Sequence, residues 1–181
     1  MKSESRFKTG NVMPIVVLTL ICLLITAALA FTNHITAPII KETQRAVAEQ
    51  ARKDVLPQAE GFKLLNMSGL PESVTEVYKA ENDVGYVFMI TTDGYGGKDT
   101  MNLACGIGAD GNITAVKVLS HEETAGLGSR VTESKFTDQF IGKNADLDGV
   151  DVISGASRSS RYFINAVRDA FDAYEMAKGA E

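Results

Sequence analysis

The sequence predicts an α+β domain that follows a single transmembrane helix near the N-terminus. Three observations support this fold class: a charge-free apolar segment at the start, runs with strand-like alternation in the middle, and a long amphipathic helix at the end. The chain has 181 residues and is 45% hydrophobic, which is enough for one compact domain with an appendage but not for two full domains.

The apolar segment covers residues 12–31 and contains no charged residue. About 20 helical residues at roughly 1.5 Å each span the hydrocarbon core of a bilayer. We therefore expect a transmembrane helix over residues 12–32. Two alternatives remain open. One is a cleaved signal peptide, because Ala28-Leu29-Ala30 has the A-x-A form, although the apolar run exceeds the usual hydrophobic region of such peptides. The other is a buried core helix.

The charges that flank the apolar segment indicate its orientation. Three cations and one acid precede it within residues 1–11, and the first cation after it is Lys41. The positive-inside rule places the N-terminus in the cytoplasm and the domain outside, in a single-pass protein of the cell (inner or plasma) membrane. Removing the +2 of residues 1–11 from the formal −5 leaves −7 on the remainder, which argues against nucleic-acid binding.

The chain contains two cysteines, and neither supports a disulfide or a metal site. Cys22 lies in the predicted span and Cys105 in the domain, so they do not reach each other. Two isolated cysteines also form neither a zinc site nor an iron–sulfur site. We expect no metal, and the exported domain has to rely on its own core.

A helical pattern follows the membrane segment. Apolar residues recur at four-residue spacing within residues 39–55, and Pro57 ends the pattern. We interpret residues 33–57 as a helical stalk that leads to a domain over residues 58–181.

The middle of the chain is expected to form an antiparallel sheet. Strand-like runs cover residues 74–79, 84–92, 102–108 and 113–119, after a loop at 61–72. Asp-Gly at the centre of the turn between the last two runs is typical of a tight hairpin.

Helices are expected to follow the strands. Residues 132–141 read as a short helix with Thr132 as its N-cap, and residues 150–153 as a short strand. The final helix is predicted over 159–178 because six apolar residues form one stripe at helical spacing. They are Phe163, Ala166, Val167, Ala170, Phe171 and Tyr174.

Two familiar motifs occur in the sequence without the context that they need. Gly106, Gly108 and Gly111 fit G-x-G-x-x-G, but a dinucleotide site requires a helix to begin there, and the prediction is a hairpin turn. His121-Glu122 begins H-E-x-x-H, but residue 125 is Ala, so no zinc-protease site exists.

Three other stretches combine glycine with polar side chains. Asp93–Gly97 follows a predicted strand, its glycines allow the backbone to approach a flat ligand, and Tyr95 offers a ring for stacking. His121–Gly128 suits a heteroaromatic ligand with a hydrogen-bonding edge and an apolar face. The alternative for each stretch is an ordinary surface loop.

The third stretch, Ser154–Ser157, immediately precedes the final predicted helix. Backbone N–H groups at a helix N-terminus attract anions, and Arg158 and Arg161 add charges that suit a phosphate. The alternative is that one of the serines caps the helix and no ligand is involved.

Taken in order, GYGG, the Asp-Gly hairpin, H-x-E-T-A-G-L-G and D-x-x-S-G-A-S resemble the FMN-binding domain of the G subunit of the Rnf ion-translocating electron transport complex. The C subunit of the sodium-pumping NADH:quinone oxidoreductase is a related, usually longer chain. In this family a flavin transferase attaches FMN as a phosphoester of the last hydroxyl residue in the motif. This chain has Ser157 where the family usually has threonine, and Ala125 where it usually has proline.

The resemblance implies an electron-carrying subunit with no catalytic residue of its own. Such a subunit belongs to a redox-driven oxidoreductase that couples ferredoxin/NAD chemistry to sodium or proton translocation. The implied partners are the other membrane subunits, the lipid bilayer and the flavin transferase, and the implied cofactor is covalent FMN. The alternative is an anchored extracytoplasmic flavoprotein or a small-ligand-binding module outside an ion pump.

The resemblance also implies which residues hold the flavin, with Ser157 as the point of attachment. The others expected near the cofactor are Tyr95, Gly96, Gly97, Glu123, Thr124, Gly126, Leu127, Gly128, Ser154, Gly155, Ala156 and Arg158.

Overall fold

The computed structural model describes residues 12–179. The predicted cytoplasmic segment at residues 1–11, with the charges used for orientation, lies outside the described residues. The chain forms two compact units, one ending at Arg45 and the other beginning at Ala46. Each is considered by itself below.

The first unit is helical. It contains most of helix α1, which runs from Val12 to Val55 without a break between the predicted span and the predicted stalk. Pro14 lies in its first turn, where a helix tolerates proline. The apolar side chains of residues 12–31 are exposed, and this part of α1 is long and apolar enough to cross a membrane.

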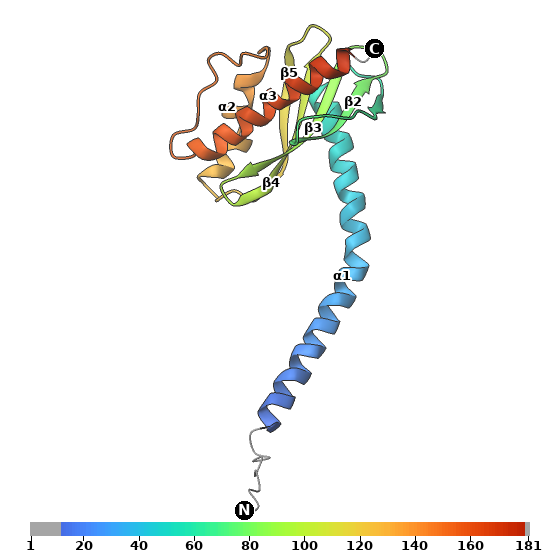
Figure 1. Cartoon of the computed structure of the whole chain (residues 1–181), viewed down its shortest axis with the longest axis vertical. Coiled ribbons are helices and arrows are strands. Elements are labelled where there is room, and N and C mark those ends of the chain that lie inside the picture. The colour runs from blue at the N-terminus through green and yellow to red at the C-terminus, as the bar shows by residue number, and fades with distance from the viewer. Residues whose placement is uncertain (1–11, 180–181) are drawn as a thin grey trace, which may run out of the picture. The chain divides into compact units, whose positions relative to one another are not determined.

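The second unit is built on a five-stranded sheet in which every strand pairs antiparallel with the next one in the chain (Figure 1). The strands are β1 Phe62–Leu65, β2 Val74–Ala80, β3 Gly85–Gly94, β4 Gly97–Gly108 and β5 Ile113–His121. The turn between β4 and β5 closes with the Gly108 N–H donating to the Asn112 carbonyl, at 2.8 Å. The antiparallel sheet and the expected hairpin are therefore confirmed.

Helix α3, Ser157–Gly179, lies across one face of this sheet (Figure 1). All six residues of its predicted apolar stripe are buried in the main core. They meet Tyr86, Phe88 and Ile90 of β3, which alternate along the strand and so share one face. The short helix α2, Ser134–Thr137, adds Phe136 to the same core.

The opposite face of the sheet is covered by the end of α1. Ala51, Val55 and Leu56 pack against a second cluster that includes Val87 and Met89 of β3. Asp54 also forms an ion pair with Lys117 of β5, and the hydroxyl of Thr114 donates to the Val55 carbonyl. Because both faces are covered, β3 is buried continuously from Gly85 to Ile90 instead of alternating.

Several predicted elements differ from the structure. Residues 61–72 contain the edge strand β1, whose four residues are too few to show a clear alternation. Residues 132–141 form no single helix: the 3₁₀ helix η2 (Gly128–Thr132), α2 and the 3₁₀ helix η3 (Asp138–Phe140) follow one another. Thr132 is not an N-cap, because Glu133 occupies that position and the Thr132 hydroxyl donates to the Ser129 carbonyl.

The segment at residues 150–153 is a loop, and not the short strand that its apolar residues predict. Two of its backbone N–H groups donate to side chains: Gln139 accepts from Asp151 at 2.8 Å, and Ser160 accepts from Ile153 at 3.0 Å. Helix α3 then begins at Ser157, two residues before the predicted start.

Substitution Gly106→Ala is expected to destabilise the second unit by about 1–3 kcal/mol, because overpacking forces neighbours to move. A Cβ at this position would lie 2.4 Å from both the Val55 carbonyl oxygen and the Thr114 hydroxyl. The measurement is urea unfolding of the full chain in detergent. Gly179→Ala, which meets nothing within 4 Å, is the control. Equal stability of the two variants would contradict the close approach of α1 to β4.

Candidate functional site

The three stretches singled out in the sequence meet at one cavity of about 380 Å³ in the second unit. Its walls come from the turn between β3 and β4, from the loop after β5 and from the start of α3. The lining residues are Tyr95, Glu123, Thr124, Leu127, Gly128, Gly155, Ala156, Ser157, Arg158 and Ser159. A cavity of this size falls within the range of small-molecule sites.

A buried carboxylate joins the three walls. Glu123 is only 8% exposed, and its Oε1 accepts a hydrogen bond of 2.8 Å from the backbone N–H of Tyr95. Its Oε2 accepts a hydrogen bond of 2.7 Å from the hydroxyl of Ser159 on α3. The side chain therefore ties the β3–β4 turn and the helix to the loop that carries it. This geometry gives Glu123 a structural role that the sequence did not predict.

Two glycines make room for this carboxylate. A Cβ at Gly94 would lie 2.4 Å from Oε1 of Glu123, and a Cβ at Gly128 would lie 1.9 Å from Oε2. Both distances are far below van der Waals contact, so any larger residue at either position displaces Glu123. The glycines of two predicted stretches thus serve the packing of Glu123.

The serines around the start of α3 divide into two pairs. Ser159 and Ser160 are buried: Ser159 donates to Glu123, while Ser160 accepts from Ile153 N–H and donates to the Ala156 carbonyl at 2.9 Å. Ser154 and Ser157 are exposed, and their hydroxyls make no hydrogen bond within the described residues. Only Ser157 of this second pair lines the cavity.

The alternative that a serine caps α3 is not what the structure contains. The N-cap is Ala156, whose carbonyl accepts the first helical bond from Ser160 N–H at 3.0 Å. Alanine has no side-chain acceptor and is among the poorest N-cap residues. Within residues 12–179, no side chain accepts from the backbone N–H groups of Ser157, Arg158 or Ser159. Together with the helix dipole, these N–H groups favour an anion beside Ser157.

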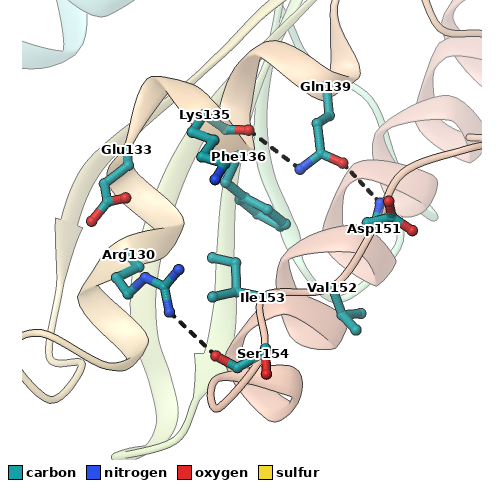
Figure 2. Close-up of a pocket in the computed structure, with 9 residues that line it drawn as sticks. All are labelled: Arg130, Glu133, Lys135, Phe136, Gln139, Asp151, Val152, Ile153 and Ser154. Atoms are coloured by element: carbon teal, nitrogen blue, oxygen red, sulfur yellow. Dashed lines mark hydrogen bonds between the residues drawn. The ribbon is translucent and has the colours of Figure 1, made fainter.

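The loop before α3 is held from its other side as well. A second hollow of about 380 Å³ is lined by residues of η2, α2, η3 and the loop itself (Figure 2). In Figure 2 the Arg130 guanidinium donates to the Ser154 carbonyl at 3.2 Å, and Gln139 accepts from the Asp151 N–H. No motif in the sequence singles out Arg130 or Gln139, so sequence reasoning missed both.

Apolar and cationic groups surround the mouth of the cavity. Tyr95 is 64% exposed and Leu127 is 51% exposed, so both offer apolar surface beside the cavity that they line. The Arg158 guanidinium lies 5.9 Å from the Tyr95 ring centroid and 5.6 Å from that of Tyr162. It also donates to the Tyr162 hydroxyl at 3.2 Å, and this bond raises the pKa of Arg158.

Four of the predicted site residues do not line this cavity. Ser154 borders the second hollow instead. Gly96 lies in the β3–β4 turn, where a Cβ would be 3.1 Å from the Glu122 carbonyl, so it allows the turn to approach the loop after β5. Gly97 and Gly126 face open space and have φ of +140° and +74°, conformations that favour glycine.

The thiol of Cys105 takes no part in the site. Cys105 lies in the main core, and burial raises the pKa of its thiol to about 12. A thiol of this kind is unreactive at neutral pH. Among the described residues, no group of acidic, histidine and cysteine side chains is suited to hold a metal ion.

Substitution Ser159→Ala is expected to lower the stability of the second unit by about 1–3 kcal/mol, because Glu123 loses one of its two hydrogen bonds in a buried position. The measurement is urea unfolding of the full chain in detergent. Ser154→Ala removes an exposed hydroxyl that makes no bond and should leave stability unchanged. A Ser159→Ala variant as stable as this control would refute the bridging role of Glu123.

Comparison with known proteins identifies the family of the chain. Residues 94–172 match the FMN-binding domain family, and this range contains every predicted site residue. The chain is 33% identical to the G subunit of the Na(+)-translocating ferredoxin:NAD(+) oxidoreductase complex of Acetobacterium woodii, over 89% of this chain and 81% of that protein. It is 31% identical to the G subunit of the ion-translocating oxidoreductase complex of Methanosarcina acetivorans, over 98% of this chain and 100% of that protein.

A further relative is the G subunit of the proton-translocating ferredoxin:NAD(+) oxidoreductase complex of Clostridium ljungdahlii, 24% identical over 86% of each chain. The resemblance inferred from the motifs is confirmed by these similarities. The chain belongs to the family of G subunits of ion-translocating oxidoreductase complexes of the Rnf type, and it carries their FMN-binding domain.

Proposed function

We propose that the chain carries FMN as a phosphoester of Ser157 and passes electrons within a membrane complex. The observation that carries the proposal is the state of the Ser157 hydroxyl. It is exposed, free of hydrogen bonds within the described residues, placed on the cavity wall and set at the start of α3. The neighbouring Ser159 and Ser160 hydroxyls are buried and already bonded, so they are unsuited to esterification.

The residues of the cavity fit FMN. A phosphate ester at Ser157 would lie at the N-terminus of α3, where Ala156 leaves the N–H groups uncapped. Tyr95 and Leu127 offer exposed apolar surface to a flat ring system. When bound, the isoalloxazine ring supplies the redox chemistry, while the protein holds it in place and excludes part of the solvent.

The relatives indicate which complex such a carrier serves. Two of them are named as subunits of ferredoxin:NAD(+) oxidoreductase complexes, one sodium-translocating and one proton-translocating. In our proposal this chain works with other membrane subunits that couple ferredoxin/NAD chemistry to the translocation of sodium ions or protons. A flavin transferase would mature it. No general acid or base is needed for electron relay, and we assign none.

We further propose the topology that the sequence predicts. Residues 12–32 cross the bilayer, 33–57 lead away from it, and the domain over 58–181 is extracytoplasmic. The exposed apolar surface of residues 12–31 supports the membrane-spanning role, because exposing so much apolar surface to water is energetically unfavourable. The excess of cations in residues 1–11 supports the orientation.

Intact-mass analysis tests the attachment. The chain purified after co-expression with a flavin transferase is expected to carry the mass of one FMN minus one water, and Ser157→Ala is expected to carry none. Ser157→Thr keeps an alcohol and should retain the addition. Ser154→Ala, which removes the other exposed hydroxyl of the motif, should be modified like the parent chain. An unmodified parent chain, or a modified Ser157→Ala, would refute the ester at this position.

Accessible cysteines test the topology. A cysteine introduced at the exposed position of Ser134 is expected to react with a membrane-impermeant maleimide in intact cells or spheroplasts. A cysteine in place of Ser3 should react only after the membrane is permeabilised. The native Cys105 is buried and should stay unlabelled in both cases, and Cys22 is replaced by alanine. The reverse pattern of labelling would overturn the orientation.

A further inference from the structure

Arg158 is the only cationic residue among those that line the cavity. It is exposed, yet its guanidinium is held at the cavity by three contacts. The Tyr95 and Tyr162 rings lie 5.9 and 5.6 Å away, and the Tyr162 hydroxyl accepts a hydrogen bond of 3.2 Å. The hydrogen bond to Tyr162 and the proximity of the two rings favour this rotamer of Arg158 over the others that a surface arginine samples.

The position of the Tyr95 ring depends in turn on the buried carboxylate. Glu123 accepts the 2.8 Å hydrogen bond from the Tyr95 N–H and so fixes the backbone of Tyr95. The backbone position in turn limits where the Tyr95 ring can lie relative to Arg158. Tyr162 lies one turn along α3 from Arg158, so its position is set by the helix. Two elements that meet at the cavity thus hold one positive charge between them.

We propose that Arg158 stabilises the reduced form of the flavin and thereby raises its midpoint potential. The inference rests on the proposed function, in which FMN occupies this cavity. Oxidised isoalloxazine is neutral. On taking up two electrons from a redox centre of another subunit and one proton from solvent, it gains one negative charge. A fixed cation at the cavity wall lowers the free energy of the anion and leaves the neutral form almost unchanged.

Two carboxylates near Arg158 act in the opposite direction, because a negative charge raises the free energy of the anionic reduced flavin. Asp93 of β3 lies close enough to raise the pKa of Arg158. Among the described residues that line the cavity, Glu123 is the carboxylate, and both of its oxygens accept hydrogen bonds from the protein. Both acids are present in every variant below, so replacing Arg158 changes only the contribution of the cation to the potential. Because Arg158 is exposed, salt should weaken its influence over distances near the Debye length, about 8 Å at physiological ionic strength.

The experiment is spectroelectrochemistry of the flavinylated full chain in detergent, where an electrode supplies the electrons. The variants are Arg158→Gln, Arg158→Lys and, as a matched control, Arg168→Gln, which removes an exposed arginine of the same helix that does not line the cavity. We expect a lower midpoint potential in Arg158→Gln and a smaller decrease in Arg158→Lys. Arg168→Gln should keep the potential of the parent chain, and high salt should reduce the difference between Arg158→Gln and the parent.

The variant Tyr162→Phe separates the effect of the position of the Arg158 guanidinium from the effect of its charge. It keeps the aromatic ring and the arginine but removes the hydrogen bond to Arg158, so the potential should fall less than in Arg158→Gln. Unfolding curves check that each variant is folded before its potential is compared.

The opposing outcomes are distinct. An unchanged potential in Arg158→Gln, or an equal decrease in Arg168→Gln, overturns the proposal. An unchanged potential with a lower yield of flavin also overturns it and makes Arg158 a phosphate ligand. If intact mass shows no covalent FMN in the parent chain, the proposed ester at Ser157 is refuted, and the proposed role of Arg158 is still open to test. FMN added to the apoprotein then provides the comparison of potentials, with the same outcomes deciding the role of Arg158.

Discussion

The carboxylate of Glu123 reaches two neighbouring segments at once, and the cavity depends on this double contact. One oxygen fixes the turn that presents Tyr95, and the other fixes Ser159 two residues after Ser157. A buried carboxylate is stable only when its oxygens accept hydrogen bonds. The folded state therefore requires the loop, the turn and the helix to be in contact at the same time. Gly94 and Gly128 leave the space that this arrangement needs.

The sheet supplies the rigid frame behind this contact. Its central strands are covered on one face by α3 and on the other by the last turns of α1. Two walls of the cavity are therefore attached to this sheet in different ways. The β3–β4 turn projects from the sheet itself, and Ser157 begins the helix that packs on it. Side chains from η2 and η3 hold the intervening loop, which has no regular structure of its own.

The features that were predictable from the sequence are local ones. The apolar stripe of α3, the strand-like runs of β2 to β5 and the Asp-Gly hairpin each follow from a short-range pattern or a turn preference. The grouping of the three motif stretches followed from their resemblance to a family, and the structure brings them to one cavity. Local pattern did not reveal β1, because four residues at the edge of a sheet carry little periodic signal.

The remaining errors have a common cause in tertiary hydrogen bonds. Residues 150–153 look like a strand, but Gln139 and Ser160 take the N–H groups that a strand would offer to a neighbour. The hydrogen bonds of Glu123 to Tyr95 and Ser159 were not predicted either, because these partners lie 28 and 36 residues away along the chain. Hydrogen bonds between residues far apart in the chain produce no local sequence pattern from which they could be predicted.

The alanine at the N-cap of α3 has a consequence for the order in which the protein is completed. A 23-residue helix begins here without a side chain to satisfy its first amides. In the proposed flavinylated protein, the diester phosphate beside Ser157 supplies the missing acceptor, as Asp or Thr does at other helices. The prosthetic group would then complete a secondary-structure element as well as carry electrons, so the first turn of α3 would receive its last acceptor only when the flavin is attached.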